Sequence, residues 1–439
     1  MNKIRNILNS NYFIAFIYLI TIICWFYHWQ NLAIIIYLIS AIVIIIFNAN
    51  RINLATLIMA GIISFREKSF SGNAKLFIII FLIVLPFIVY DFFKNHLKVN
   101  DWIFISMFLI VVASILSLIN SNRENINYVI MGILQTGAFA LIYLYFINKH
   151  QKDDFLYIAK NATALGLAIA IEFILYIITY QGDTLGKDID LGWGISNGIA
   201  MLEMMMIPLI IYLYSSNQSN TYLLLSVIVV FVVIVLTLSK GAYLTLLIII
   251  FPLFLVTYMK IPDRKKFIND IIYSLFVFTF LLYLTSNIEF IKNGFLTYFK
   301  KMNDRGWFND QSRVEIYKIG LETFKIFPIF GGGAYTGGYY LGKHGLSITT
   351  YHNYLIQILA TIGITGFIAF IMYLYNIIRR IIKVNHLYNF CILFDIIALM
   401  LHGLVDNTWF NPMVMVIVSI FFSTILTEKD IKNLNNTLN

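Results

Sequence analysis

A histidine at the end of a long polar segment is the residue best placed for acid–base chemistry in this chain of 439 residues. His352 precedes an apolar stretch and follows Thr349 and Thr350, either of which can cap a helix. We therefore expect His352 in the first helical turn, where the positive end of the helix dipole disfavours imidazolium. A neutral imidazole at the water boundary can accept a proton from a hydroxyl group. The alternative is a histidine that only caps its helix.

Two cations could bind an anionic group near this base. The planar guanidinium of Arg313, at the start of a predicted helix, matches a phosphate through two parallel hydrogen bonds. A salt bridge to Glu315 or Asp310 is its alternative role. Lys240 is the only charged residue in the stretch 222–259 and lies in a short turn between two apolar runs. Such a cation is often functional, although it can also extend to the interface only to hydrate its charge.

A glycine run from Gly331 to Gly338 offers bare backbone N–H groups that could hold a phosphate, with Gly332 and Gly333 as the candidates. The run lacks the GxxxxGK[ST] order of a nucleotide-binding loop, and a flexible hinge is the alternative. The sequence contains no HExxH or CxxC pattern, so we expect neither a catalytic metal nor a cofactor. Three further residues are candidates for lining a substrate groove: Asn197, Asn353 and Tyr335.

Four ionisable residues interrupt the apolar runs, namely Glu172, Glu203, Asp395 and His402. Asp395 and His402 are seven positions apart and share a helix face, and Asp406 follows His402 by four. Such residues can form a proton relay in a transporter, line a polar groove or pair with a neighbouring helix. The sequence leaves these alternatives open.

Composition predicts an all-α fold, a polytopic helical bundle in a membrane. Hydrophobic residues make up 60% of the chain and charged residues 12%, whereas a water-soluble domain carries about 25% charged residues. The net charge of +9 is spread over short groups beside the apolar runs, so a nucleic-acid partner is not expected. At about 20 apolar residues per helix, the candidate spans are 12–27, 32–47, 52–65, 76–93, 102–119, 128–147, 155–180, 195–214, 222–238, 243–259, 268–285, 352–376, 387–405 and 412–426.

The distribution of basic residues predicts about 14 spans with both chain ends in the cytoplasm. In this topology the inside segments carry seventeen basic residues and the short outside loops six. The stretch 52–65 is the weakest span, because it is short and could lie at the interface. The predicted units are a transmembrane bundle at 1–285, an extracytoplasmic catalytic loop at 286–351, and a second transmembrane part with a cytoplasmic tail at 352–439.

The loop 286–351 carries eight basic and five acidic residues, a net charge of +3. An anionic ligand would explain this excess, and attraction to anionic lipid headgroups is the alternative. Apolar spacing predicts two helices in the loop, 290–302 and 314–327. Asp310 or Ser312 can cap the second helix, and the proline and glycines that follow would end it.

Five motifs in a fixed order resemble the O-antigen ligase and O-antigen polymerase (Wzy) superfamily of bacterial envelope enzymes. The resemblance covers about residues 192–426, and the first half of the chain matches only as a run of spans. The motifs are Gly194-Ile195-Ser196-Asn197-Gly198-Ile199-Ala200, Ser239-Lys240-Gly241-Ala242, Arg313, Pro328-Ile329-Phe330-Gly331-Gly332-Gly333, and His352-Asn353-Tyr354-Leu355 with Gly363-Ile364-Thr365-Gly366.

This resemblance implies an inverting, metal-independent glycosyl transfer from an undecaprenyl-diphosphate-linked oligosaccharide. The site would face outward from the bacterial cytoplasmic membrane, and a flippase and a chain-length regulator are the candidate protein partners. The resemblance assigns Arg313 to the diphosphate and His352 to activation of the acceptor hydroxyl. Lys240 stands where the family commonly has arginine, and lysine keeps the charge without the bidentate geometry.

We favour a polymerase that adds repeat units to O-antigen, capsule or exopolysaccharide, because nothing in the sequence marks a lipid A-core acceptor. An O-antigen ligase that joins the glycan to another acceptor is the alternative within the superfamily. A polysaccharide flippase or another transporter is the alternative from a different class. It would place ionisable groups at mid-membrane in two related halves, whereas this chain has one large loop late in the sequence.

Overall fold

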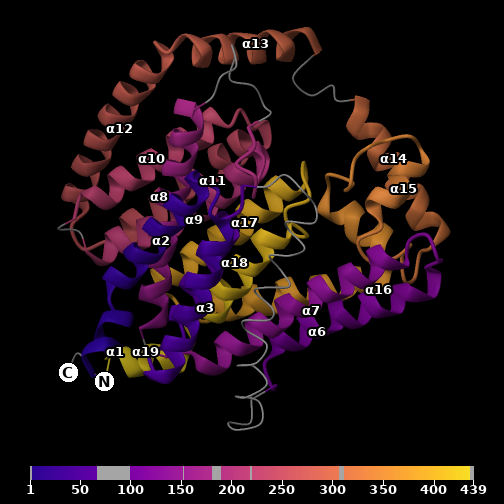
Figure 1. Ribbon diagram of the computed structural model, residues 1–439, viewed down its shortest axis with the longest axis horizontal. Coiled ribbons are helices and arrows are strands. Elements are labelled where there is room, and N and C mark those ends of the chain that lie inside the picture. The colour runs from indigo at the N-terminus through magenta and orange to yellow at the C-terminus, as the bar shows by residue number, and fades with distance from the viewer. Residues whose placement is uncertain are drawn as a thin grey trace.

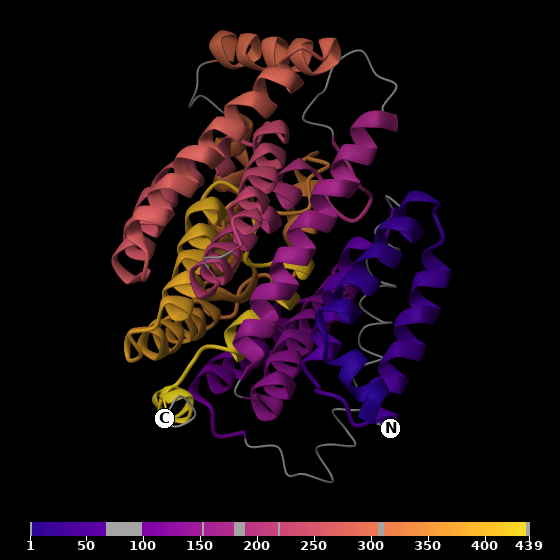
Figure 2. The same cartoon turned by 90° about the vertical axis from the view of Figure 1, so that its left-hand side faces the viewer.

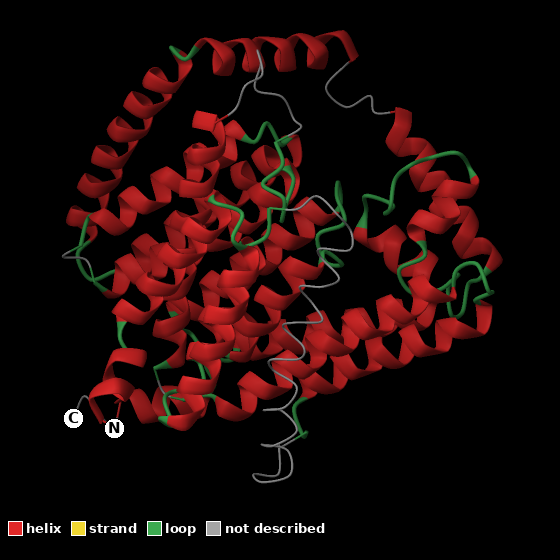
Figure 3. Ribbon diagram, viewed as in Figure 1, coloured by secondary structure: helices red, strands yellow, loops and turns green. Residues whose placement is uncertain are grey.

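The fold is helical throughout, as Figure 3 shows. The computed structural model describes residues 2–66, 99–151, 153–179, 189–217, 220–305 and 311–435. Helices account for 79% of the structure, and the described residues contain no strand beyond one bridge between Asp190 and Ile195. The predicted all-α class is therefore confirmed.

Most of the predicted spans coincide with a helix; the predicted span 76–93 lies outside the described residues. The helices of the first half are α1 (Asn2–Leu8), α2 (Asn11–Phe26), α3 (Gln30–Ile46), α4 (Asn53–Ile63), α6 (Trp102–Leu116) with the 3₁₀ turn η1 (Ser117–Asn120), α7 (Ile126–Lys149), α8 (Asp154–Thr179) and α9 (Ser196–Ser216). Those of the second half are α10 (Tyr222–Leu236), α11 (Lys240–Lys260), α12 (Arg264–Ser286), α13 (Glu289–Arg305), α14 (Gln311–Ile326), α15 (Gly337–Lys343), α16 (Tyr354–Ile382), α17 (Leu387–Gly403), α18 (Pro412–Ser423) and α19 (Glu428–Asn435).

Seven of the described helices are long and apolar enough to cross a membrane. The pair α1 and α2, bent by 60°, would add an eighth if it forms one span. These helices indicate a membrane protein. They do not confirm the expected total of about 14 spans, because α3, α4, α10, α17 and α18 are apolar but shorter.

The weakest predicted span, 52–65, is a short helix inside the bundle. α4 has 11 residues, and all of them are buried. At 1.5 Å per residue it extends about 16 Å, roughly half of the hydrocarbon thickness. Its apolar sequence reflects burial among α2, α3, α8 and α18 rather than contact with lipid. α4 is thus one of the shorter apolar helices and is not among those long enough to cross a membrane by length and composition.

The centre of the bundle is α9, and α12 lies at its edge. In the most apolar part of each helix, 89% of the residues are buried for α9 but only 11% for α12. α9 is apolar on all sides, as expected for a helix surrounded by others, and it contacts α8, α10, α11 and α17. The first turn of this central helix contains Asn197.

The polar segment between α12 and α16 forms an outer layer. In Figures 1 and 2, α13 lies at one end of the molecule, and α1 and α19 lie at the opposite end. α13 and α14 confirm the two helices predicted in this segment. Ser312 is the second residue of α14 and so does not cap it, and Asp310 lies outside the described residues. A small separate core joins α14, α15 and the first part of α16, formed by Ile316, Ile319, Leu341, Tyr351 and Ala360.

A break in α16 ties this outer layer to the bundle. Gly363 interrupts the helix with φ +67° and ψ −165°. The helix N–H groups freed by the break are satisfied by the loop after α14: Ile364 donates to the Pro328 carbonyl (2.9 Å) and Thr365 to the Ile329 carbonyl (3.2 Å). A Cβ at Gly363 would lie 2.3 Å from the carbonyl oxygen of Ile329, so only glycine permits this approach.

Candidate active site

His352 lies just outside the helix that it was expected to enter. α16 begins at Tyr354, and its N-cap is Asn353, whose side-chain oxygen accepts hydrogen bonds from the N–H groups of Leu355 (3.0 Å) and Ile356 (3.1 Å). The expectation that His352 occupies the first turn, behind a threonine cap, is therefore wrong, because the asparagine is a stronger cap and lies closer. His352 itself has φ +49°, which turns the chain sharply before the helix.

A carboxylate holds the imidazole of His352. The Nδ1 atom of His352 lies 2.9 Å from Oδ1 of Asp406, in the loop between α17 and α18. The His352 side chain is 30% exposed and that of Asp406 18% exposed. Burial would raise the pKa of Asp406, but the hydrogen bond and charge of His352, with smaller contributions from His402 and the Asn407 N–H, hold it well below the usual carboxyl range. Asp406 is therefore ionised at neutral pH.

The ionised carboxylate selects one tautomer of the histidine. A carboxylate can only accept hydrogen bonds, so Nδ1 of His352 must donate its N–H to Asp406. Nε2 of the neutral ring is then the unprotonated nitrogen and can receive a proton. The negative charge of Asp406 also stabilises the imidazolium that results, as in other pairs of an aspartate with a catalytic histidine. The helix dipole was expected to disfavour the imidazolium form of His352. The negative charge of Asp406 acts in the opposite direction.

Two more side chains extend this pair into a hydrogen-bonded network. The Nδ2 amide of Asn197, in the first turn of α9, donates to Oδ2 of Asp406 at 2.7 Å. The hydroxyl of Ser239 donates to Oδ1 of Asn197 at 2.9 Å. Ser239 is also the N-cap of α11, where its hydroxyl oxygen accepts from the N–H of Ala242. The network therefore joins the beginnings of α9 and α11 to His352 and to the loop after α17.

Gly241 allows α11 to approach α17 closely. A Cβ at this position would lie 2.6 Å from Cγ2 of Val405 and 3.2 Å from Cδ2 of His402. The first turn of α11 is thus pressed against the residues that lead into Asp406. This geometry explains the motif Ser239-Lys240-Gly241. Ser239 caps α11 and joins the network, Lys240 supplies a positive charge, and Gly241 allows the close approach because it has no side chain.

Lys240 is the exposed first residue of α11, directly after the capping serine. Its Nζ lies 6.0 Å from the ring centroid of Tyr298 on α13, at the outer limit of a cation–π contact. α13 therefore passes close to the cationic beginning of α11. Lys240 directly follows Ser239 of the His352 network, and it is exposed, so a ligand can reach it.

Arg313 lies on the helix that is attached to the His352 loop. The hydroxyl of Tyr317 on α14 donates to the carbonyl oxygens of His352 (3.2 Å) and Leu404 (3.4 Å). Arg313 is four residues before Tyr317 and so lies about one turn away on the same face of α14. Arg313 as a residue is half-buried. α14 thereby brings Arg313 toward the two segments that carry His352 and Asp406.

The backbone donors expected from the glycine run are used inside the protein. The N–H of Gly332 donates to the carbonyl of Ala360 at 2.8 Å, and that of Gly333 to the carbonyl of Thr361 at 3.0 Å. Both glycines are buried against the break in α16. Their N–H groups therefore satisfy carbonyls of the broken helix, and the run is a packed joint, neither a phosphate cradle nor a free hinge.

The three residues expected to line a groove have different positions. Asn197 belongs to the network of Asp406. Asn353 is the cap of α16, and its amide donates to the carbonyl of Leu404 at 3.0 Å, which fastens the His352 loop to the end of α17. Tyr335 has φ +63° and packs beside Gly132 of α7.

The ionisable residues within the apolar helices are buried. Glu172 accepts a hydrogen bond from the indole N–H of Trp193 at 2.8 Å, which supports pairing with a neighbouring segment. Glu203 and Asp395 are fully buried in α9 and α17. His402 lies against Gly241 and contributes to the low pKa of Asp406.

Asp406 is the functional candidate that the sequence reasoning missed in this role, because its spacing suggested His402 as its partner.

Part of the chain that carries this site resembles a known protein family. Residues 225–371 match the model of the O-antigen ligase family, consistent with the O-antigen ligase and polymerase superfamily. The matched stretch contains Lys240, Arg313 and His352, whereas Asn197 and Asp406 lie outside it. A search of curated proteins finds no match. That family is associated with glycosyltransferase-like activity of the O-antigen ligase or polymerase type.

Proposed function

We propose that this chain, with its O-antigen ligase domain at residues 225–371, is a membrane glycosyltransferase that polymerises a polysaccharide. Its donor is an undecaprenyl-diphosphate-linked oligosaccharide, and its acceptor is a sugar hydroxyl on the growing chain. The reaction takes place at the extracytoplasmic boundary of the bacterial cytoplasmic membrane. The observation that carries the proposal is the hydrogen bond between His352 and Asp406, which orients the imidazole as a base.

The chemistry is a displacement at the anomeric carbon of the donor sugar. The acceptor oxygen forms the new glycosidic bond while the bond from the anomeric carbon to the diphosphate breaks, and the bonding electrons leave with the diphosphate. The acceptor proton passes to Nε2 of His352. Asp406 stays ionised and stabilises the imidazolium, and is thus a positioning residue. Attack from the side opposite the leaving group inverts the anomeric configuration.

Arg313 and Lys240 serve the leaving group. Negative charge grows on the diphosphate as the bond breaks, and preorganised cations stabilise this charge. Arg313 can contact two phosphate oxygens at once, and Lys240 contributes a point charge at the first turn of α11. The lipid-facing surface of the bundle would accommodate the prenyl tail, because α11 and α12 expose many large apolar side chains.

Polymerase and ligase differ only in the acceptor. We favour the polymerase because the chain carries no feature that marks a lipid A-core acceptor. The ligase reaction would use the same base and the same cations. Capsule, exopolysaccharide and O-antigen are all compatible products.

Turnover of the purified protein tests the proposal. In detergent or nanodiscs, it should convert undecaprenyl-diphosphate-linked oligosaccharide into longer lipid-linked products without ATP and in the presence of EDTA. Transfer to an added lipid A-core acceptor without lengthening would support the ligase instead. Movement of the lipid between leaflets with no new glycosidic bond would favour a flippase and contradict the proposal.

A further inference from the structure

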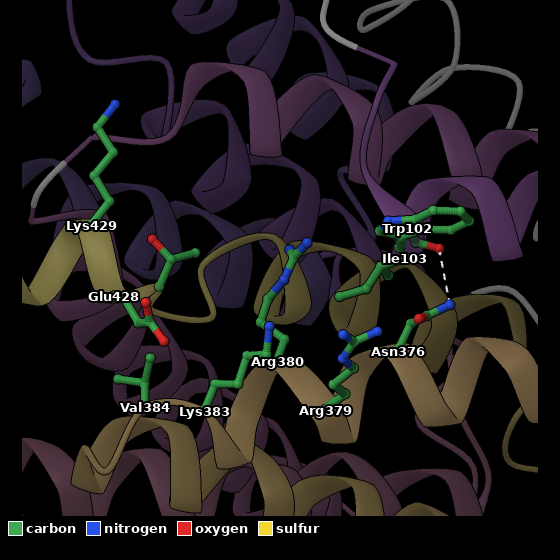
Figure 4. A pocket seen from close by; sticks show the side chains of 10 residues that line it. Trp102, Ile103, Asn376, Arg379, Arg380, Lys383, Val384, Glu428 and Lys429 are labelled. Atoms are coloured by element: carbon green, nitrogen blue, oxygen red, sulfur yellow. Dashed lines mark hydrogen bonds between the residues drawn. The ribbon is translucent and has the colours of Figure 1, made fainter.

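A charged cavity lies at the end of α16 opposite to His352. It has a volume of about 420 Å³ and is formed by the first turn of α6, the last turns of α16 and the start of α19. Figure 4 shows Arg379, Arg380 and Lys383 along α16, and Glu428 and Lys429 from α19 beside them. The cavity thus gathers four cations and one carboxylate from segments far apart in the sequence.

One of the four cations is already neutralised. The guanidinium of Arg380 forms a salt bridge with Asp101 and donates to the hydroxyl of Tyr143 at 2.9 Å. Arg379, Lys383 and Lys429 are exposed, and Glu428 is the only acidic residue among those lining the cavity. Three cations against one carboxylate leave an excess of two positive charges. An anion is the ligand that this excess favours.

The surroundings of the cavity favour a lipid as the source of that anion. Trp102 lines the cavity and is 62% exposed, as is typical of indole rings at the membrane interface. Apolar side chains near the same end of α16 are also exposed, Tyr375 at 60% and Ile382 at 64%. Cations beside an exposed apolar surface match a phosphate headgroup with acyl chains below it.

We propose that this cavity binds the phosphate of an anionic membrane lipid. The site is separate from the His352 network, because the 16 residue steps from Gly363 to Arg379 extend about 24 Å along α16, close to the hydrocarbon thickness. Arg379 and Lys383 contact the phosphate from α16, and Lys429 contacts it from α19. A bound lipid would thereby join the C-terminal helix to the bundle.

Native mass spectrometry of the full-length protein tests the site. The probes are phosphatidylglycerol and, with the same acyl chains, phosphatidylcholine. The wild type should retain phosphatidylglycerol in preference to phosphatidylcholine. The triple variant Arg379→Gln, Lys383→Gln, Lys429→Gln should bind phosphatidylglycerol on the order of 100-fold more weakly, because each cation contributes about fivefold. Arg380 is left unchanged, since its salt bridge with Asp101 holds α16 to α6.

A second triple variant is the matched control. Lys3→Gln, Arg5→Gln, Lys265→Gln removes the same charge from exposed positions outside the cavity, and should retain the lipid within about threefold of the wild type. Equal loss in both triple variants would overturn the proposal, because the attraction would then be nonspecific. Displacement of the lipid by millimolar inorganic phosphate would also overturn it and assign the cavity to a soluble anion. If the first triple variant does not fold, Lys429→Glu alone, in α19, should still lower retention, and unchanged retention would contradict the site.

Discussion

The imidazole of His352 and the carboxylate of Asp406 lie 2.9 Å apart, although 54 positions separate them in the sequence. The carboxylate is further held by the amide of Asn197 and by the N–H of Asn407. Asp406 therefore has little freedom to rotate, and it fixes both the tautomer and the orientation of the histidine. This relationship supports the proposal that His352 acts as a base.

Replacing Asp406 with asparagine should lower the transfer rate on the order of 10³- to 10⁴-fold, because the amide can stabilise the wrong tautomer and cannot stabilise imidazolium. Single-turnover rates measured on folded variants at neutral pH check this effect. Asp153→Asn, which alters an exposed carboxylate near the start of α8, is the control. A wild-type rate in Asp406→Asn would contradict the positioning role of Asp406.

Stability should depend on pH through the same carboxylate. The pKa of Asp406 is lowered in the folded protein, so folding favours its ionised form. This contribution is fully present above the ordinary carboxyl pKa of about 4 and is lost as the pH falls toward the lower folded value. The difference in Tm between wild type and Asp406→Asn should therefore be largest near neutral pH and shrink below about pH 4. A difference that grows on acidification would show that the carboxylate is not stabilised by ionisation.

Arg313→Lys should raise the donor KM or lower kcat/KM by roughly 10-fold or more, because lysine keeps the charge but cannot bind two phosphate oxygens in a fixed plane. Steady-state kinetics with lipid-linked donor measure this effect. Lys325→Gln removes a charge from the last turn of the same helix and should leave the kinetics unchanged. Wild-type kinetics for Arg313→Lys would indicate that only the charge matters.

Lys240→Arg should be tolerated or should increase activity, because an exposed position at the first turn of α11 can accommodate the longer arginine side chain and its N–H donors. Lys240→Gln should weaken donor binding by about 10-fold, since one cation is lost from the diphosphate site. Donor titration by product formation compares the two variants. Complete loss of activity in Lys240→Arg would mean that the site is shaped around the lysine.

Gly363→Ala should destabilise the protein and impair transfer, because it forces φ +67° on a residue with a side chain and places Cβ 2.3 Å from the Ile329 carbonyl oxygen. With ψ at −165°, this backbone lies in a region that is essentially restricted to glycine, and a side chain there costs about 1–3 kcal/mol. Gly342→Ala is the control, since a Cβ there meets nothing within 4 Å. Thermal unfolding in detergent should show a lower Tm for the first variant only. Equal Tm values would mean that the joint with the loop after α14 is not rigid.

Local patterns in the sequence were sufficient for the helices of the outer layer. The apolar spacing of Val314, Tyr317, Leu321 and Phe324 predicted α14, because this spacing depends only on the helical period. Apolarity could not distinguish a helix in lipid from one buried in protein, so α4 was expected to span or to lie at the interface. Both environments favour the same side chains.

The contacts of the candidate site depend on the tertiary fold and could not be predicted. His352 and Asp406 are on different segments, and spacing suggested His402 as the partner of Asp406 instead. Gly332 and Gly333 were recognised from the sequence as positions whose backbone N–H groups could bind an acceptor, and the acceptors are carbonyls of α16. Whether a phosphate or the broken helix α16 would use their N–H groups depended on Gly363, whose positive φ the sequence does not reveal.

The most direct test of the central claim is the single-turnover rate of glycosyl transfer in His352→Gln, measured with saturating lipid-linked donor. Glutamine retains hydrogen-bonding capacity toward Asp406 but cannot accept the acceptor proton. We expect a rate at least about 10³-fold below wild type, with donor binding nearly unchanged. The control His344→Gln, at an exposed position after α15, should be fully active. A wild-type rate in His352→Gln would contradict the account.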